Sequence, residues 1–223
     1  GISIKEVFSD IIVEAPLGSR TKLTLPDGTL VWLNAGSRIT YSQGFGVGNR
    51  KIELIGEGYF EVKRNEEVPF LVKTNSLLVK VLGTKFNFRD YPDDAEAIVS
   101  LSEGKVALNN LLKKEKEAFL LPNERVVLNK KNGRMHVEYS TVSNALQWTN
   151  GYLFFDEELL PDVVKELERS YNVKIQIASD TLNTFRFYGN FVHREQNIQE
   201  VLEALSATRK IHYIIEGHNI TLY

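Results

Sequence analysis

Hydrophobic and polar residues alternate in short runs along the first part of the chain. From Ile11 to Tyr139, apolar runs recur at intervals of about 8–12 residues and are separated by turn residues. Thr21–Leu25 and Lys85–Arg89 alternate strictly, as half-buried antiparallel strands do. No stretch here has the spacing of an amphipathic helix. The pattern predicts a mainly β domain, an antiparallel sandwich or β-roll. Strands are expected at Thr21–Leu25, Leu30–Asn34, Lys51–Leu54, Tyr59–Val62, Phe70–Thr74, Leu77–Leu82, Lys85–Arg89, Ala97–Leu101, Lys105–Leu108, Ala118–Leu121, Arg125–Leu128 and Met135–Tyr139.

The pattern changes after Ser140. Apolar residues at positions 159, 160, 163, 164, 167 and 171 predict an amphipathic helix that ends at Asn172, with Arg169 on its polar face. A second helix is predicted over Ile198–Arg209. Strands are expected at Tyr152–Phe155, Val173–Ala178, Phe185–Val192, Ile211–Ile215 and Asn219–Tyr223. The order βαββαββ predicts a small α+β domain, with both helices on one face of a sheet.

Six blocks of turn and strand residues follow one another in the first region. They are Leu25–Thr29, Leu33–Ser37, Gly56–Val62, Pro69–Val72, Val81–Phe88 and Glu103–Val106. Asp27-Gly28 lies between two apolar runs and predicts a tight hairpin turn. In this order and spacing, the blocks resemble the periplasmic domain of the FecR family over residues 14 to 109.

The last part of the chain resembles the C-terminal domain that follows FecR domains in Bacteroidota. Trp148–Phe155 and Leu167–Val173 carry this resemblance, which covers residues 148 to 223. In plan, the domain is similar to the small signalling domains of secretins and TonB-dependent transducers. We therefore expect a linker over residues 1–13, a FecR-like β domain over 14–140, a connector over 141–151 and an α+β signalling domain over 152–223.

The resemblance implies a function in signalling. FecR proteins are membrane-bound regulators of alternative sigma factors, which implies the periplasmic part of an anti-sigma regulator. The implied partners are the signalling domain of a TonB-dependent outer-membrane receptor and an extracytoplasmic-function sigma factor, the latter through a cytoplasmic segment outside this sequence. The chain starts at Gly1 without methionine. We expect a fragment that follows a missing inner-membrane helix.

Composition and net charge argue against several classes of function. The 223 residues carry a net charge of −2, which argues against a nucleic-acid partner because such binding requires a basic surface. The chain has no cysteine, which excludes disulfides and thiol catalysis. No apolar run approaches the 18 or so residues that span a bilayer.

Candidate partner-binding residues lie in the α+β domain. The last strand, with Ile220, Leu222 and Tyr223, is expected to form an exposed sheet edge that accepts a partner strand. Nearby aromatic side chains are candidate anchors for a protein partner. They are Phe185, Phe187, Tyr188 and Phe191. The alternative is that most of these residues form the core of the domain.

The sequence offers few candidate catalytic or metal-binding residues. We expect that the protein is not an enzyme and binds no cofactor and no metal. The four histidines show no ligand spacing, and the acidic residues Asp93 and Asp94 provide too few oxygens for calcium. At Gly83-Thr84, attack of the hydroxyl on the preceding carbonyl would shift the acyl group from N to O, and hydrolysis of the resulting ester would cleave the backbone. The resemblance makes this reaction an alternative, because some regulators that resemble this family self-process. The favoured interpretation is a glycine that admits a bulge beside an edge strand.

A carbohydrate-binding β-sandwich is the alternative function. It would use Trp32, Tyr41, Phe45 and Tyr59 as stacking platforms, with Phe45 on a glycine-hinged loop. A jelly-roll enzyme ranks below both functions because the sequence offers no metal triad.

Overall fold

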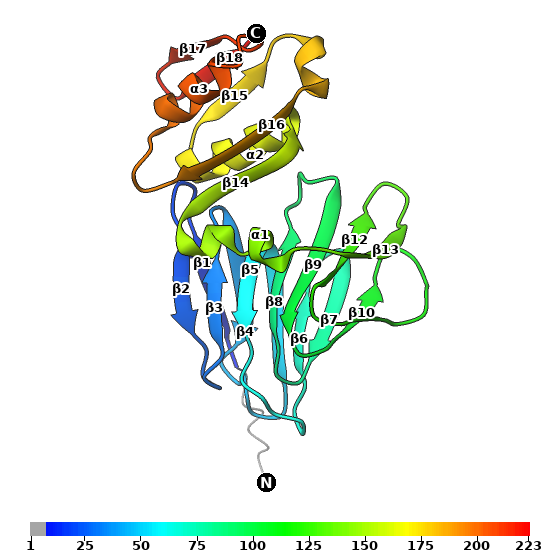
Figure 1. Cartoon of the computed structure of the whole chain (residues 1–223). Helices are drawn as coiled ribbons and strands as arrows, with labels where there is room; N and C mark the ends of the chain where they lie inside the picture. Colours follow the sequence, from blue (N-terminus) through cyan, green and yellow to red (C-terminus); the bar gives the residue numbers. More distant parts are fainter. Residues whose placement is uncertain (1–7) are drawn as a thin grey trace. The chain divides into compact units, whose positions relative to one another are not determined.

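The computed structural model describes residues 8–223, and the chain divides into two compact units (Figure 1). Of the described residues, the first unit comprises 8–15 and 21–142, and the second comprises 16–20 and 143–223. Among the described residues, no helix is both long and apolar enough to cross a bilayer.

The first unit is built from strands. They are β1 (Asp10–Ala15), β2 (Thr21–Thr24), β3 (Leu30–Leu33), β4 (Ser37–Ser42), β5 (Arg50–Glu61), β6 (Phe70–Lys73), β7 (Leu77–Val81), β8 (Lys85–Asp90), β9 (Glu96–Glu103), β10 (Val106–Asn110), β11 (Ala118–Leu120), β12 (Glu124–Asn129) and β13 (Met135–Tyr139). The predicted mainly β architecture is confirmed.

Strand β5 belongs to two sheets. Its first half pairs with β4 and β6, in the order β1-β4-β5-β6-β7-β10-β11. Its second half pairs with β3 and β8, in the order β2-β3-β5-β8-β9-β12-β13. The strand changes partners at Gly56, which has a φ of 98°. A Cβ there would lie 2.4 Å from Ser37 Oγ, so only glycine fits.

A phenylalanine cluster forms the centre of the first unit's core. Phe60, Phe70, Phe86 and Phe88 are fully buried, and the Phe60 and Phe86 rings stack with centroids 5.1 Å apart. Phe86 and Phe88 occupy alternate positions of β8, which places both on the inward face of that strand, opposite Phe60 of β5 and Phe70 of β6 in the core.

Three features of the first unit differ from the sequence prediction. The linker predicted over 1–13 is wrong for residues 10–13, which belong to β1, and residues 1–7 lie outside the described residues. The strands predicted at Lys51–Leu54 and Tyr59–Val62 are the two halves of β5. Strand β4 was not expected, because Ile39 and Tyr41 are its only apolar residues.

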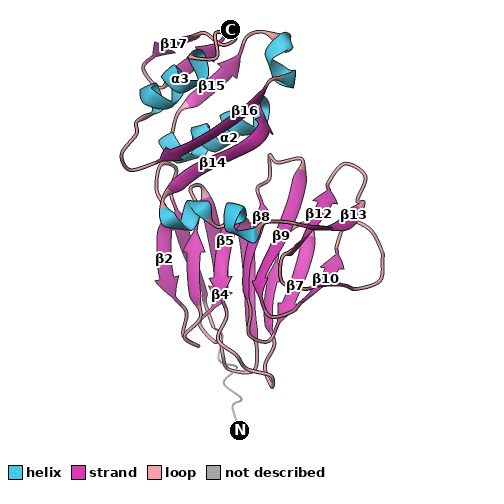
Figure 2. Cartoon of the chain, viewed as in Figure 1, coloured by secondary structure: helices cyan, strands magenta, loops and turns pink. Residues whose placement is uncertain are grey.

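The second unit mixes helices and strands (Figure 2). Its elements are α1 (Val142–Ala145), a 3-10 helix (Gln147–Asn150), β14 (Tyr152–Leu159), α2 (Leu160–Tyr171), β15 (Lys174–Ile177), a 3-10 helix (Asp180–Thr184), β16 (Arg186–Val192), α3 (Ile198–Ser206), β17 (Tyr213–Glu216) and β18 (Asn219–Leu222). From β14 onward the order is βαββαββ, as predicted.

The strands of this unit form two small sheets, and the expectation of one sheet is wrong. Strands β14 and β16 pair antiparallel, while β15, β18 and β17 form the second sheet. Strand β18 lies in the centre of that sheet, parallel to β15 and antiparallel to β17. The last strand, β18, therefore pairs with β15, a strand that lies much earlier in the sequence.

Both helices of this unit begin and end at recognisable signals. Helix α2 ends at Asn172, which has a φ of 50° as a left-handed C-cap, so the predicted helix end is confirmed. Helix α3 begins with a capping box between Asn197 and Glu200, and it ends at Ser206 rather than at Arg209. Arg169 was expected on the polar face of α2 but is buried, 3.7 Å from the carboxylate of Glu166.

Candidate functional site: an aromatic sheet face and a buried polar scaffold

The structure separates the predicted partner-binding residues into core and surface. Phe187, Phe191, Ile220 and Leu222 are buried in the core of the second unit, and Phe185 packs against that core. As contact residues these five predictions are wrong, because β16 and β18 turn four of them inward and Phe185, directly before β16, packs against the same core. Of the predicted set, Tyr188 and Tyr223 are exposed, with 66% and 50% of their surface accessible.

Tyr188 lies on the outer face of the sheet formed by β14 and β16. Because side chains alternate along a strand, Phe187 and Tyr188 point to opposite faces. The Tyr188 ring meets the Phe154 ring edge to face, with centroids 6.1 Å apart. Tyr152 and Phe154 are half-buried at alternate positions of β14. We call Tyr152, Phe154 and Tyr188 the aromatic face.

The free sheet edges of this unit are not where the sequence placed them. The prediction of β18 as an edge is wrong, since it has a neighbour on each side. The edges are β15 and β17 in one sheet and both strands of the other. At the end of β16, the side chain of Gln196 accepts a hydrogen bond from the Val192 amide at 2.8 Å. This contact closes that part of the β16 edge.

Tyr171 closes the same loop from helix α2. Its hydroxyl donates a hydrogen bond to the carbonyl of Gln196 at 2.8 Å. Burial raises the pKa of the Tyr171 hydroxyl to about 12, so it remains a donor at physiological pH. Two hydrogen bonds at Gln196, one to its side chain and one to its carbonyl, therefore hold the loop after β16.

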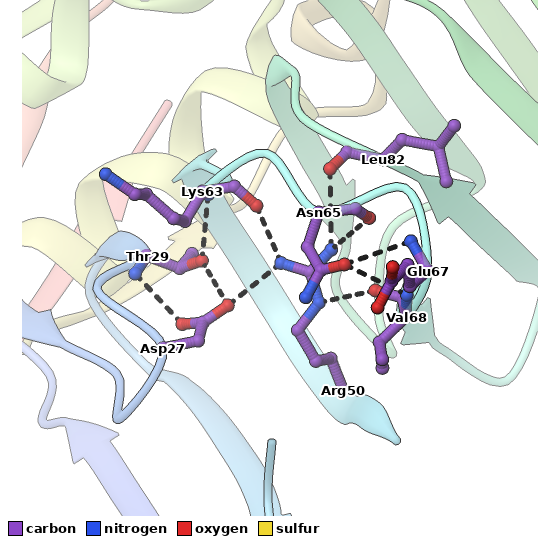
Figure 3. A network of polar contacts seen from close by, with 8 residues as sticks. All are labelled: Asp27, Thr29, Arg50, Lys63, Asn65, Glu67, Val68 and Leu82. Carbon is purple, nitrogen blue, oxygen red and sulfur yellow. Dashed lines mark hydrogen bonds and ion pairs between the residues drawn. The ribbon is translucent and has the colours of Figure 1, made fainter. Parts of the chain in front are cut away.

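A buried arginine organises three segments of the first unit (Figure 3). Arg50, at the start of β5, is 2% exposed. Its guanidinium donates to the Asp27 carboxylate at 3.0 Å and to the carbonyls of Lys63 and Val68, each at 2.7 Å. It also reaches the carbonyls of Asn65 at 3.2 Å and Leu82 at 3.4 Å. The network ties the β2–β3 turn and the loop after β5 to the end of β7.

The Asp27 turn and the 63–68 loop are also held by their own side chains. Asp27 accepts hydrogen bonds from the amide and the hydroxyl of Thr29, at 2.9 and 2.8 Å. The Thr29 hydroxyl accepts one from the Lys63 amide. Asn65 accepts from the amides of Glu67 and Val68. Sequence analysis did not find Arg50, because most of its partners are backbone carbonyls, which no residue pattern reveals.

A second buried network joins three of the sequence blocks. Glu57 accepts hydrogen bonds from the side-chain amides of Asn34 at 2.8 Å and Asn87 at 2.9 Å. The Arg89 guanidinium lies 3.7 Å from the same carboxylate. Glu57 lies in β5, Asn34 directly follows β3, and Asn87 and Arg89 both lie in β8. The blocks that carry the family resemblance therefore supply a structural scaffold.

Gly83-Thr84 lies between β7 and β8, both of which have a partner on each side. The expected position beside an edge strand is thus wrong, and the nearest register shift falls between Lys85 and Phe86. A Cβ at Gly83 would lie 2.7 Å from the Cα of Arg64, which explains the glycine by close approach of two backbone segments. The Thr84 hydroxyl is buried without a hydrogen-bond partner. Self-cleavage at this bond stays the alternative to this structural interpretation of Gly83.

The aromatic residues proposed for carbohydrate stacking do not form a platform. Phe45 and Tyr59 are buried, and Tyr41 packs against the core. The expectation of an exposed Phe45 is wrong, because its ring meets the Phe70 ring in the core with centroids 5.9 Å apart. The Lys22 ammonium lies 4.5 Å from the centre of the Trp32 ring and covers one face of it. This arrangement argues against the carbohydrate-binding alternative.

No group of three or more metal-ligating side chains is present among residues 8–223. In the acidic loop, Asp94 forms an ion pair with Arg89 at 2.8 Å. That contact uses one of the carboxylates that calcium would require.

Comparisons with known proteins agree with this architecture. The family model described as "FecR protein" matches residues 12–107, and the model described as "FecR, C-terminal" matches residues 152–222. Two crystal structures of a "putative anti-sigma factor" from Parabacteroides distasonis ATCC 8503, at 1.65 and 2.50 Å resolution, are similar over most of their length. Each shares 33% sequence identity with this chain at a TM-score of 0.87. The alignments cover 96% of this chain and 98% and 99% of the other chains. No curated protein matches.

The two family matches, one on the β domain and one on the small α+β domain, and the similarity to these structures support the role of an anti-sigma regulator. The chain belongs to the FecR family.

Proposed function

We propose that this protein relays a signal from a TonB-dependent outer-membrane receptor to an extracytoplasmic-function sigma factor. The chain would work in the periplasm, and the full-length protein would be anchored in the inner membrane. The sigma factor would be bound by a cytoplasmic segment outside residues 1–223. Membership in the FecR family supports the regulatory role.

The aromatic face is the observation that carries the choice of receptor-binding surface. Tyr188 is 66% exposed on β16, opposite the register shift between Phe155 and Glu158 of β14, and two further aromatic side chains lie at alternate positions of β14. Tyrosine is enriched among the residues that dominate protein–protein binding energy, because it buries a large rigid surface and retains a polar tip. The receptor's signalling domain would cover this face.

Isothermal titration calorimetry with the signalling domain of a TonB-dependent receptor encoded beside this protein tests the proposal. We expect binding of the unmodified chain, and we expect Tyr188→Ala to weaken it by about tenfold or more, as for an interface anchor. Tyr223→Ala is the matched control, because Tyr223 is an exposed tyrosine of the same unit that directly follows β18, a strand of the other sheet. It should leave the affinity unchanged.

Two results would overturn parts of the proposal. Absence of binding by the unmodified chain, together with retention on a glycan array, would replace the receptor relay with carbohydrate recognition. Loss of binding in Tyr223→Ala but not in Tyr188→Ala would move the contact to the sheet of β15, β18 and β17.

A further inference from the structure

Strand β13 is a terminal strand of its sheet and has exposed apolar side chains. It pairs with β12 on one side, and the sheet ends there. Val137 is 44% exposed and Tyr139 is 86% exposed, although both share the face of Met135, which packs against the core. A terminal strand with uncovered apolar residues is a candidate site for pairing with another strand.

The hydrogen-bond pattern shows which backbone groups of β13 face the free edge. The Asn129 amide donates to the Arg134 carbonyl, and the Ser140 amide donates to the Asn123 carbonyl. In an antiparallel pair, residues that bond across the ladder alternate with residues that do not. His136 and Glu138 therefore bond toward β12. The amides and carbonyls of Met135, Val137 and Tyr139 point outward.

The side chains of β13 are self-complementary about Val137. We propose that β13 pairs antiparallel with β13 of a second copy of this chain, with Val137 on the twofold axis. Val137 then meets Val137 of the second copy, and Met135 meets Tyr139. His136 meets Glu138 of the second copy, which places an imidazole opposite a carboxylate. Each outward amide and carbonyl of β13 gains a partner.

The position of His136 and Glu138 favours this register. In the new ladder they form the non-hydrogen-bonded pairs, in which side chains approach most closely. Both residues already lie on one face, with the His136 ring 3.3 Å from the Glu138 carboxylate of the same strand. Arg125 on β12 also bonds Glu138 and holds its carboxylate at the edge. Opposite side chains that attract stabilise a strand pair.

The other terminal strands of the first unit do not have this property. In β1, the outward backbone groups belong to Asp10, Ile12 and Glu14, because the Gln43 amide donates to the Ser9 carbonyl. A twofold pair centred on Ile12 would place Asp10 against Glu14, which repel each other. Strand β2 carries Lys22, a residue that protects sheet edges. Strand β11 has only three residues.

Analytical ultracentrifugation of the whole chain over a range of protein concentrations tests this proposal without any receptor domain. Its outcome is therefore independent of the proposed function. We expect a weak monomer–dimer equilibrium, because one strand pair buries less surface than a stable interface needs. Val137→Lys places two ammonium groups at the twofold axis and should abolish the dimer. Val47→Lys is the control, because Val47 is 77% exposed in a loop outside β13.

A charge exchange distinguishes this register from other contacts. His136→Glu places two carboxylates opposite each other twice in the dimer and should raise its dissociation constant by about tenfold or more. The double variant His136→Glu/Glu138→His exchanges the partners and should restore dimerisation. A chain that stays monomeric up to about 1 mM would overturn the proposal. A dimer that persists in Val137→Lys would do so as well.

The absence of native cysteine permits a geometric check. Residues facing each other in a hydrogen-bonded antiparallel pair have Cα atoms about 5.5 Å apart, within disulfide range. Val137→Cys should oxidise to a covalent dimer faster than Val47→Cys does. Equal rates for the two variants would contradict the proposed axis.

Discussion

The two units of this protein differ in where they place their polar and aromatic residues. The first unit buries polar side chains in networks around Arg50 and Glu57. Among the described residues of the second unit, the buried polar side chains are those of Arg169 and Ser170, and its core is otherwise apolar. The second unit instead exposes Tyr188. The blocks that identify the first unit therefore fix its structure, whereas the second unit presents the clearer surface for recognition.

Removing the Arg50 side-chain charge should have the largest effect on the first unit. Arg50→Met leaves the Asp27 carboxylate without its ion-pair partner and takes the guanidinium donor away from several carbonyls. We expect a loss of about 3–5 kcal/mol in the free energy of unfolding, as for other broken buried charge pairs. Urea denaturation measures this loss. Arg64→Met is the control, because the exposed Arg64 pairs with Glu66 at the surface. A loss below about 1 kcal/mol would show that the network does not stabilise the unit.

Adjacent positions in β16 should separate folding from recognition in the second unit. Phe187→Ala empties a core position and should lower the stability by about 3 kcal/mol. Tyr188→Ala should change it by less than about 0.5 kcal/mol, as surface substitutions do. Thermal unfolding of the two variants provides the comparison. Equal losses would show that Tyr188 is held by packing, which would weaken its assignment as a contact residue.

Substitution of Thr84 should have a smaller and opposite effect. Its hydroxyl is buried without a partner, so Thr84→Val keeps the shape and removes an unsatisfied polar group. We expect a gain of about 1 kcal/mol in stability.

The same variant tests self-cleavage at Gly83-Thr84. Mass spectrometry of the unmodified chain after long incubation should show the intact mass. Fragments of residues 1–83 and 84–223, absent in Thr84→Val, would instead establish the cleavage reaction.

The smallest expected effect is a pH dependence at the edge of the first unit. The hydrogen bond from Arg125, followed by smaller contributions that include His136, lowers the pKa of the Glu138 carboxyl from its usual value of 4.5. At pH values above 4.5, the ionised carboxylate of Glu138 therefore stabilises the folded state. The gain is lost as the pH falls through the lowered pKa.

Because Glu138 is partly exposed, this gain should stay below about 1 kcal/mol. Comparing the unmodified chain with Glu138→Gln between neutral and acidic pH, in dilute solution, measures it. Identical pH profiles would contradict the role assigned to Arg125.

The alternation of residues was sufficient to predict most strands and both main helices. The turn residues Asp27-Gly28 predicted the β2–β3 hairpin, and the structure has a turn there with Gly28 at a φ of 88°. The sequence pattern also predicted the end of α2 at Asn172. These features depend on local rules of turn and cap formation, so the local sequence carries the information.

Non-local pairing could not be predicted in the same way. The parallel contact between β15 and β18 makes β18 a central strand and removes the predicted edge. Alternation also does not reveal which of two adjacent aromatic residues faces the core. Phe187 and Tyr188 could be assigned only after the helices had fixed the inner face of the β14–β16 sheet. Arg50 was missed because its partners lie as far as 32 residues away.

The sharing of β5 between two sheets has a consequence for how the first unit assembles. Its two halves pair with β3, β4, β6 and β8, so neither sheet can be completed before β5 is in place. Formation of the unit then requires many long loops to close at once, which slows folding in proteins dominated by non-local strand pairs. A newly made chain would therefore remain open to proteases and chaperones until Gly56 takes up its bend and both sheets close together.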